Sequence, residues 1–466
     1  MRISALKNQR IALLGLGREG KAVYEVLRKY FPSQPLYIIC EQAPEWEPID
    51  SNVIIQVENL NEVDLSAFDV LIKSPGISLY HPAIIAAKKA GVSITSGSNI
   101  WFSERGDQIV VAITGSKGKS TTAALTAHLF QTSGLKVELA GNIGVPLIEK
   151  LDVEADIWVL ELSSFQIADL DANLDLAVLL SWFPEHLDWH GGVKIYQQDK
   201  LRLLGMAKQQ LIANEVSPLV KKVLPMLQPL VYDQTGVWSV AEDGIARNGQ
   251  LALSADMIPL PGRHNWRNAC AALSIFEHFS NHFSISIEQA LSAISTFKSL
   301  PHRLEVIAKV AGRIYVNDSI ATTPLATVMG LRAYQGKNII LIAGGFDRGL
   351  TWTPVVEQLK IQPFQAVIGL PDTGYQLIDS LERQLENKSE SKLTDIALNK
   401  ILYKAEDLGH ALEISQSIDA GLNEQVILLS PGAASFCQFR NFVERGECFS
   451  ELVSQLINSE VITQAH

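Results

Sequence analysis

The stretch that decides the fold is Ile109-Val-Val-Ala-Ile-Thr-Gly-Ser-Lys-Gly-Lys-Ser-Thr121, followed by the helical pattern Ala123-Ala-Leu-Thr-Ala-His-Leu-Phe130. The β-branched run predicts a buried strand, and the glycines let backbone N–H groups turn toward an anion at the start of a helix. The loop is the shorter GxxGK[ST] form of a phosphate loop, because a full Walker A motif needs a glycine where Ile113 stands. An ordinary glycine-rich turn is the alternative, and the strand-loop-helix context favours nucleotide binding over it.

Within this loop, Lys119 is expected to reach the β- and γ-phosphates of a nucleotide, and Ser120 is expected to ligate Mg²⁺. A neighbouring strand should then end in an acidic residue that holds the metal, and Asp156-Ile-Trp-Val-Leu-Glu161 supplies one. A glutamate at the end of a strand is by itself more often a capping or surface group. Beside a phosphate loop, Glu161 is predicted to be a Mg²⁺ ligand. The loop residues predicted to bind ATP are Gly115, Ser116, Lys117, Gly118, Lys119, Ser120 and Thr121.

The 466 residues exceed what one hydrophobic core usually supports, and short apolar runs alternate with helical patterns throughout. We therefore predict an α/β fold of three domains, with a Rossmann-like first domain (1–106), a central P-loop-type ATPase domain with a mainly parallel sheet (107–301), and a Rossmann-like third domain (302–466). Strands are predicted at 10–15, 36–40, 53–57, 69–73, 92–95, 109–114, 156–161, 313–317, 338–343 and 426–429. Helices are predicted near 265–278 and 287–297.

Composition limits the classes of partner. A net charge of −11 argues against binding to nucleic acid or to an anionic membrane, since both need a basic face. The four cysteines have no metal-ligand or disulfide spacing, and no apolar run is long enough to cross a bilayer. The N-terminus enters a strand too early for a signal peptide. We therefore expect a cytoplasmic protein without nucleic-acid or membrane partners, and a monomer.

The first domain contains Gly15-Leu-Gly-Arg-Glu-Gly20 after a strand, with Glu41 after the next strand at about the ribose-binding distance. Alone, this GxGxxG motif indicates NAD and a dehydrogenase. The second phosphate loop, with Glu161 as its predicted metal ligand, argues against a dehydrogenase. The same turn can hold another phosphate-bearing substrate through backbone N–H groups at a helix start.

Several short blocks occur together in a fixed order, and through them the whole chain resembles the Mur ligase family, most closely its D-glutamate-adding members. The blocks are Gly141-Asn-Ile-Gly144, Glu161-Leu-Ser-Ser-Phe-Gln166, Glu185-His-Leu-Asp188, Gly262-Arg-His-Asn265 with Asn268, Leu300-Pro-His-Arg303, Asn317-Asp-Ser319, Gly344-Gly345, and Ser430-Pro431 through Arg445-Gly446. Each block is weak alone, but their joint order is specific.

The resemblance implies a reaction of peptidoglycan synthesis. ATP would phosphorylate the carboxylate of UDP-N-acetylmuramoyl-L-alanine, and the amine of D-glutamate would attack the acyl phosphate to form an amide. Two Mg²⁺ sites are implied, because cations must neutralise the phosphates and the attacking carboxylate. The alternatives are a Mur-type ligase for another amino acid, a folylpolyglutamate-type ligase, or a P-loop ATPase without ligase activity.

The resemblance also assigns residues. Lys119, His186 and Lys200 are implied as catalytic, and the metal ligands would be Ser120, Glu161, His186 and Lys200 as a carbamate. Further ATP contacts are implied for Asn265, Asn268, Arg303 and Asp318. The UDP-linked substrate would bind to Arg18, Glu19, Ser74, Gly76 and Asn142. D-glutamate would bind to Thr322, Arg348, Ser435, Phe436 and Phe442.

Other roles remain open for some of these positions. From spacing alone, His186 could be a residue of a polar turn, Lys200 a solvated surface group, and Phe436 and Phe442 core aromatics. The Ser74-Pro-Gly76 segment could equally be a structural turn. Three residues depart from the family pattern: Lys117 stands where asparagine is usual, Ile320 where lysine is common, and Cys437 where an aspartate is common.

Overall fold

The computed structural model describes residues 1–44, 46–234, 236–362, 364–386, 401–419, 424–436 and 438–464. The chain forms two compact units, the first made of residues 1–258 and 267–297, the second of residues 259–266 and 298–466. The predicted boundary at 301/302 lies close to this division, whereas the predicted boundary at 106/107 lies inside the first unit. Each unit is described by itself.

The first unit begins with a five-stranded parallel sheet in the order β3-β2-β1-β4-β5. Its strands lie within one residue of their predicted positions, and one face of the sheet packs on apolar side chains of α2 and the loops around it. The elements are β1 (Ile11–Leu14), α1 (Arg18–Tyr30), β2 (Leu36–Cys40), β3 (Val53–Val57), β4 (Val70–Lys73), α2 (Pro82–Lys89), β5 (Ser93–Thr95) and α3 (Gly97–Glu104).

A second parallel sheet of the first unit has the order β11-β10-β9-β6-β8-β7. Its strands are β6 (Val110–Thr114), β7 (Val137–Gly141), β8 (Ile157–Glu161), β9 (Leu174–Leu179), β10 (Ala207–Ala213) and β11 (Leu230–Tyr232). Its helices are α4 (Lys119–Thr132), α5 (Ser164–Ile167), α6 (Leu187–His190), α7 (Val193–Arg202), α8 (Ser217–Val223), α10 (Ile287–Ile294) and α9 (Arg263–Phe283), whose residues 263–266 belong to the second unit. Every residue of β6 and β8 is buried, as expected for central strands covered on both faces.

Smaller elements complete the first unit. Three antiparallel strands form a separate sheet, β12 (Trp238–Val240), β13 (Gly244–Arg247) and β14 (Gln250–Ser254). Short 3-10 helices are η1 (Ile3–Leu6), η2 (Leu65–Ala67), η3 (Leu147–Lys150), η4 (Leu203–Met206), η5 (Asn214–Val216) and η6 (Ala255–Met257).

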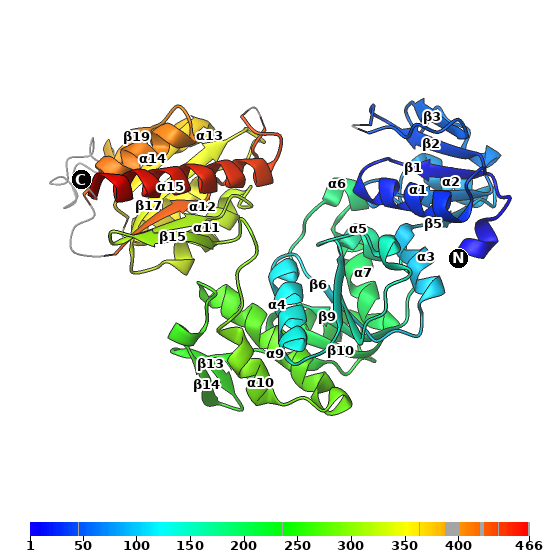
Figure 1. The fold of residues 1–466 in the computed structure, drawn as a ribbon, viewed down its shortest axis with the longest axis horizontal. Coiled ribbons are helices and arrows are strands. Elements are labelled where there is room, and N and C mark those ends of the chain that lie inside the picture. Colours follow the sequence, from blue (N-terminus) through cyan, green and yellow to red (C-terminus); the bar gives the residue numbers. More distant parts are fainter. Residues whose placement is uncertain are drawn as a thin grey trace. The chain divides into compact units, whose positions relative to one another are not determined.

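The second unit is one mixed sheet covered by helices on both faces (Figure 1). The strand order is β15-β16-β20-β17-β18-β19, and only β15 and β16 pair antiparallel. One core lies under α11, α12 and α13, and the other lies under α14 and α15. The elements are β15 (Glu305–Val310), β16 (Arg313–Asn317), α11 (Pro324–Ala333), β17 (Asn338–Gly345), α12 (Thr353–Ile361), β18 (Ala366–Asp372), α13 (Thr373–Glu386), β19 (Leu402–Lys404), α14 (Leu408–Ser417), β20 (Gln425–Leu429) and α15 (Phe442–Gln464).

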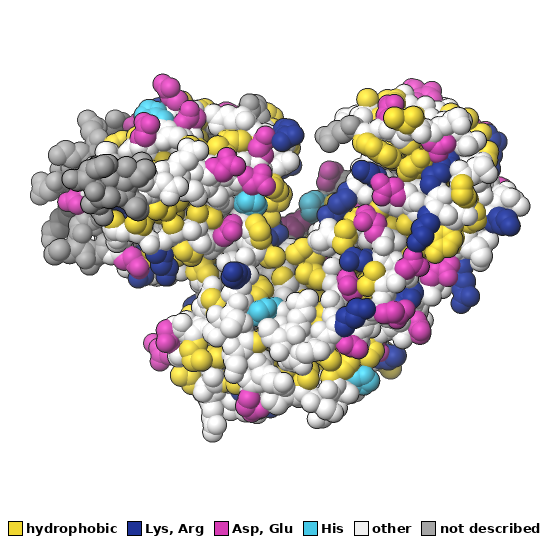
Figure 2. Space-filling view, in the orientation of Figure 1, with side chains coloured by type: hydrophobic (Ala, Val, Ile, Leu, Met, Phe, Trp, Pro, Cys, Tyr) yellow, Lys and Arg dark blue, Asp and Glu magenta, His cyan; other side chains and the backbone are white. Residues whose placement is uncertain are grey.

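The mainly parallel sheets confirm the predicted α/β fold class, and parallel strands direct the loops at their carboxyl ends to one edge of each sheet. On the face drawn in Figure 2, acidic and basic side chains are interspersed rather than gathered by sign. Across the described residues, every helix is too short or too polar to span a bilayer.

Candidate active site

The phosphate loop joins β6 to α4 at the centre of the second sheet. Gly118 has a φ of +87° and forms the N-cap of α4, a conformation that favours glycine. The ammonium group of Lys119 donates to the carbonyl oxygens of Gly115 (2.9 Å) and Ser116 (3.3 Å). The lysine therefore lies over its own loop, where an anion bound to the loop would also lie.

Residues that follow β9 form hydrogen bonds with the phosphate loop. Ser116 Oγ accepts from the backbone N–H of Phe183 at 2.8 Å and lies 2.9 Å from the Tyr196 hydroxyl. The Lys117 N–H donates to Ser181 Oγ at 3.0 Å, and the Lys117 ammonium pairs with Glu185 at 2.7 Å. These bonds fix the loop backbone, so its remaining N–H groups are oriented before a phosphate arrives.

Glu161 ends β8, the strand next to β6, and is 1% exposed. The Asn142 side chain donates to Glu161 Oε1 at 2.8 Å, while Oε2 is buried without a hydrogen-bond partner. A buried carboxylate oxygen without a partner is costly unless a cation or donor completes it. The structure thus places a buried carboxylate with one unpartnered oxygen at the end of the strand next to the phosphate-loop strand, and the role of Glu161 as a metal ligand stays a prediction.

Lys200 on α7 is 2% exposed, which is far from the solvated surface group that spacing alone allowed. Burial, together with the nearby charges of Lys119 and Lys117, lowers the pKa of Lys200 to about 7. Its ammonium nitrogen lies 5.0 Å from the centre of the Tyr196 ring. A lysine amine in this environment is substantially uncharged near neutral pH.

His186 precedes α6 in a left-handed conformation, with its ring 4.9 Å from that of Phe165. Burial lowers the pKa of His186, and the charges of Lys119 and Lys117 act in the same direction. The same two lysines therefore influence both His186 and Lys200. Among the described residues, no three His, Cys, Asp or Glu side chains are close enough to form a metal cluster, so a metal here would need ligands of other types.

The residues predicted to contact the UDP-linked substrate lie around the GxGxxG turn. Arg18 donates to the carbonyl oxygens of Asn142 (3.2 Å) and Gly144 (3.1 Å), and Gln166 donates to Glu19 at 3.3 Å. Burial raises the pKa of Glu19. Ser74 donates to the Gly15 carbonyl at 3.1 Å, which joins the two glycine-containing turns of the first sheet.

The second predicted nucleotide region includes Asn268 on α9, whose side-chain oxygen lies against Gly118 of the phosphate loop. Asn265 stands one helical turn earlier and donates to the Pro261 carbonyl at 2.8 Å. In the second unit, Asp318 follows β16 and accepts from Ser430 Oγ at 2.8 Å and from the Leu304 N–H at 3.2 Å. Burial raises the pKa of Asp318 to about 7, and the charge of Arg303 opposes this rise.

A small pocket in the second unit is lined by two of the predicted glutamate-binding residues, Thr322 and Arg348, together with Phe346, Trp352 and Gly432. Phe436 is 52% exposed and packs edge-on against Phe346 with ring centres 6.0 Å apart, so it is not the core aromatic that was the alternative.

The remaining glutamate-binding candidates lie nearby in the chain. Ser435 is buried beside the pocket wall, and Phe442 is half-buried at the start of α15, outside the pocket lining. The departures at Lys117 and Ile320 lie within the described residues, whereas Cys437 lies outside them.

Comparison with known proteins decides the family. Residues 9–96 match the model of the Mur ligase MurD-like N-terminal domain, and residues 113–276 match the model of the Mur ligase middle domain. A relative from Xylella fastidiosa strain Temecula1 is 37% identical, over 99% of this chain and 98% of its own length. The chain is a Mur ligase.

Two further relatives cover this Mur ligase almost completely. One from Xanthomonas euvesicatoria is 36% identical over 97% of this chain and 96% of its own length, and one from Micromonospora is 33% identical over 97% and 98%. All three relatives are named UDP-N-acetylmuramoyl-L-alanine–L-glutamate ligase. Mur ligases are ATP-dependent enzymes that form carbon–nitrogen bonds in the synthesis of peptidoglycan precursors, so these predictions are confirmed.

Solved structures show the same fold. The UDP-N-acetylmuramate–alanine ligase of Thermotoga maritima has a TM-score of 0.57 at 17% identity, with 96% of this chain and 100% of that chain covered. The MurF ligase of the same organism, solved with ADP, has a TM-score of 0.56 at 17% identity, covering 96% of both chains. The names of the sequence relatives differ from the sequence-based expectation in one respect, because they give L-glutamate where D-glutamate was expected.

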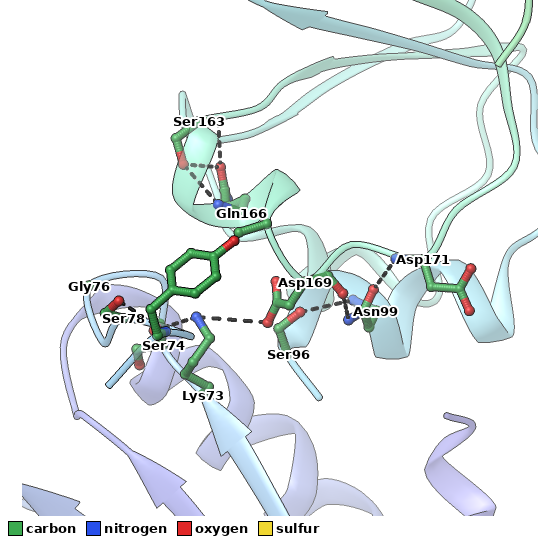
Figure 3. Close-up of polar contacts among 12 residues, drawn as sticks. Lys73, Ser74, Gly76, Ser78, Ser96, Asn99, Ser163, Gln166, Asp169 and Asp171 are labelled. Atoms are coloured by element: carbon green, nitrogen blue, oxygen red, sulfur yellow. Dashed lines mark hydrogen bonds and ion pairs between the residues drawn. The ribbon is translucent and has the colours of Figure 1, made fainter. Parts of the chain in front are cut away.

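The Mur ligase site also contains residues that the sequence did not reveal. Lys73, at the end of β4, is 2% exposed and pairs with Asp169 at 3.7 Å. Figure 3 shows the two side chains pointing toward one another, with Asn99 close to Asp169 and Gln166 capping the helix above. Asn99 donates to the Asp169 carbonyl at 2.8 Å, which ties α3 to the segment after α5.

A second hidden group runs from the loop after β4 to α7. The Tyr80 hydroxyl donates to Asp199 Oδ1 at 2.6 Å, and Asp199 Oδ2 lies 2.7 Å from His190 Nδ1. His190 is fully buried, and its Nε2 lies 3.0 Å from Ser164 Oγ. Only the proximity of His190 to His186 in the sequence hinted at this group, because Tyr80 and Asp199 are 119 residues apart.

Proposed function

We propose that this Mur ligase uses ATP to join L-glutamate to UDP-N-acetylmuramoyl-L-alanine. The observation that carries the proposal is the name shared by relatives that are 33–37% identical to this chain along nearly its whole length. The amino acid that fills the second-unit pocket would therefore be the L-enantiomer, in place of the D-glutamate expected from the sequence blocks.

The reaction has two steps. The alanyl carboxylate attacks the γ-phosphorus of ATP, and the bond to the β-γ bridging oxygen breaks. The products of this step are ADP and an acyl phosphate. The amine of glutamate then attacks the acyl carbon, the tetrahedral intermediate expels inorganic phosphate, and the amine nitrogen loses a proton to give the amide. Lys119 and the loop N–H groups would hold the β- and γ-phosphates, which supports the first step by stabilising charge on the transferred group.

Two divalent cation sites would serve this chemistry, and the residues present fit them. Glu161 has a buried oxygen without a partner, and Ser120 lies in the first turn of α4, after the strand that pairs with the Glu161 strand, so these two would hold one Mg²⁺. His186 and a carbamylated Lys200 would hold the other. Bound Mg²⁺ supplies neutralisation of the phosphate and carboxylate charges that must approach one another.

The environment of Lys200 supports a carbamate. A neutral lysine amine attacks the carbon of CO₂, a nitrogen–carbon bond forms, and one proton leaves the nitrogen for water. The product is an anion with two oxygen ligands, which suits both Mg²⁺ and the surrounding positive charge of Lys117 and Lys119. An uncharged amine at this buried position is favoured by the same burial that lowers the pKa of Lys200.

The substrate contacts remain as proposed from the sequence. Arg18, Glu19, Ser74, Gly76 and Asn142 would form the UDP-sugar side, and the hydrogen bonds that join their segments support a common site. Asn265, Asn268, Arg303 and Asp318 would contact ATP in addition to the phosphate loop. Thr322, Arg348, Ser435, Phe436 and Phe442 would surround glutamate, with the Arg348 guanidinium facing a carboxylate.

The organisation of the chain is also proposed from the sequence. It would comprise three domains, 1–106, 107–301 and 302–466, and act as a cytoplasmic monomer. The separate family matches to residues 9–96 and 113–276 support the first division.

The decisive experiment supplies purified enzyme with ATP, Mg²⁺ and UDP-N-acetylmuramoyl-L-alanine, and with either L- or D-glutamate. Product mass shows whether glutamate has been added, and chiral analysis after hydrolysis shows its configuration. We expect phosphate release and product only with L-glutamate. Product formed only with D-glutamate would refute the configuration and leave the ligase reaction intact, whereas no product with either would refute the proposed substrates.

A further inference from the structure

The loop between β4 and α2 carries Ser74 and Gly76. Hydrogen bonds join this loop to α6 and α7, the helices next to the proposed metal ligands His186 and Lys200. The Trp189 indole N–H donates to the Gly76 carbonyl at 3.0 Å, and Ser78 Oγ donates to the Trp189 carbonyl at 2.6 Å. Trp189 lies on α6, three residues after His186. The turn proposed to hold the UDP-linked substrate is thus fastened to the helix that begins at the proposed second cation site.

Tyr80 lies near the end of this loop and makes the third bond, to Asp199 on α7. Asp199 is 6% exposed and directly precedes Lys200. Its other oxygen faces His190, which in turn faces Ser164. A buried carboxylate next to His190 Nδ1 requires a proton on that nitrogen, so Nε2 accepts from the Ser164 hydroxyl. Each polar atom of the chain Tyr80–Asp199–His190–Ser164 then has a partner.

The Tyr80 hydroxyl joins this loop to α7, the helix that carries Lys200, whereas the two bonds of Trp189 join the loop to α6. Lys200 is the residue after Asp199 in the chain, so a shift of Asp199 also shifts the backbone that carries Lys200. Tyr80 is fixed in turn by the loop whose other end contacts the Gly15 turn through Ser74. A fully hydrogen-bonded network whose members Asp199, His190 and Ser164 are buried holds one geometry and transmits displacement, because each member loses a partner if another moves.

We propose that Tyr80 is a positioning residue that couples the loop of the UDP-linked substrate to the Lys200 helix, so that this substrate and Mg²⁺ bind cooperatively. The inference rests on the proposed function and goes beyond it, since it concerns residues that neither ligate the metal nor touch the substrate. By linkage, Mg²⁺ must tighten substrate binding by the same factor as substrate tightens Mg²⁺ binding.

The Lys73–Asp169 pair provides an independent attachment of the same loop. Lys73 donates to the Ser74 carbonyl at 3.3 Å and pairs with Asp169 beyond α5, a contact that does not involve Tyr80. Loss of the Tyr80 hydroxyl therefore leaves the start of the loop anchored. Substrate binding in the absence of Mg²⁺ should be nearly unchanged, and the coupling should be what is lost.

The test compares Tyr80→Phe with Tyr24→Phe. Tyr24 is a matched control, because its hydroxyl also donates to an aspartate, Asp50 Oδ2 at 3.0 Å, within the first sheet's own domain. Calorimetry measures the Kd of UDP-N-acetylmuramoyl-L-alanine with and without saturating Mg²⁺. In the wild type and in Y24F, we expect Mg²⁺ to tighten binding by about 5- to 150-fold, the usual range of coupling between sites.

In Y80F the metal-free Kd should stay within about twofold of the wild type, while the Mg²⁺-dependent factor should fall toward one. Equal Mg²⁺ factors in Y80F and the wild type, or a wild type without coupling, would overturn the inference while product formation still supported the ligase. A wild type that does not bind this substrate would overturn the proposed function and the coupling with it.

Discussion

Gly118 and the side chain of Asn268 are in contact, and a Cβ atom built on Gly118 would lie 2.4 Å from Asn268 Oδ1. The glycine also has a φ of +87°, which an L side chain adopts only at a cost of about 1–2 kcal/mol. The phosphate loop therefore depends on Gly118 for two separate reasons, its backbone conformation and its closeness to α9.

Gly118→Ala should weaken ATP binding by about 10- to 100-fold, because Asn268 and the loop must move apart and the loop N–H groups lose their alignment. The matched control is Gly134→Ala, at the other end of α4, where φ is +90° but no atom lies within 4 Å of the added Cβ. Both variants should lose thermal stability, and only G118A should lose ATP affinity by calorimetry. Equal ATP affinities in the two variants would contradict the role assigned to this contact.

Lys200→Ala should lower the ligase rate by at least about 100-fold, as expected when a ligand-sized charged group is removed from a metal site. A short-chain carboxylic acid such as propionate should partly restore the rate, because its carboxylate can occupy the space of the lost carbamate. Added bicarbonate should restore nothing, since no amine remains to react with CO₂. The rates are measured by phosphate release.

Lys119→Ala serves as the comparison for this rescue. Its missing ammonium group cannot be replaced by a carboxylate, so propionate should have no effect on it. Failure of every short acid to restore K200A, or equal rescue of both variants, would count against a carbamate on Lys200.

Local patterns predicted the strands and the phosphate loop well, because these depend on nearby residues. The apolar run before Gly115 and the one ending at Glu161 are central strands whose every residue is buried, so their sequences contain little that competes with the strand pattern. Element ends were less accurate. Helix α3 runs through Glu104 into the polar segment 103–107 that was expected to separate two domains, and α9 extends to Phe283.

Long-range polar pairs could not be predicted from the sequence. Tyr80 lies in a loop of the first sheet and Asp199 on a helix of the second sheet, while Lys73 pairs with Asp169 from another loop. No rule of sequence spacing brings either pair together. The exposed position of Phe436 likewise depends on how β20 and the following turn approach Phe346, which hydrophobicity alone does not reveal. The short blocks also do not distinguish D-glutamate from L-glutamate, because both enantiomers present the same charges.

Asp318 makes the stability of the protein depend on pH. Burial raises the pKa of Asp318 to about 7, so the folded state holds a proton that the unfolded state has already lost above about pH 4. The stabilising contribution of the protonated carboxyl is therefore complete below about pH 4 and is lost as pH rises toward 7, by at most about 4 kcal/mol.

Asp318→Asn should abolish this part of the pH dependence. Urea unfolding midpoints of the wild type should fall between pH 5 and pH 7 more steeply than those of D318N. Asp171→Asn, which removes an exposed carboxylate, should behave like the wild type. Parallel pH profiles for the wild type and D318N would show that Asp318 does not retain a proton in the folded protein.

The pocket proposed for glutamate depends on the contact between Gly432 and Trp352. Gly432 has a φ of +67°, and an added Cβ would lie 2.5 Å from the Trp352 ring, which lines the pocket. Gly432→Ala should push this ring toward the bound amino acid and raise the KM for glutamate about 10-fold, while the KM values for ATP and the UDP-linked substrate stay unchanged. Gly312→Ala is the control, because its φ is +77° and its Cβ would meet no atom within 4 Å. Since both substitutions strain the backbone similarly, only a pocket at Trp352 predicts a difference in glutamate KM, and equal values for the two variants would place the amino acid elsewhere.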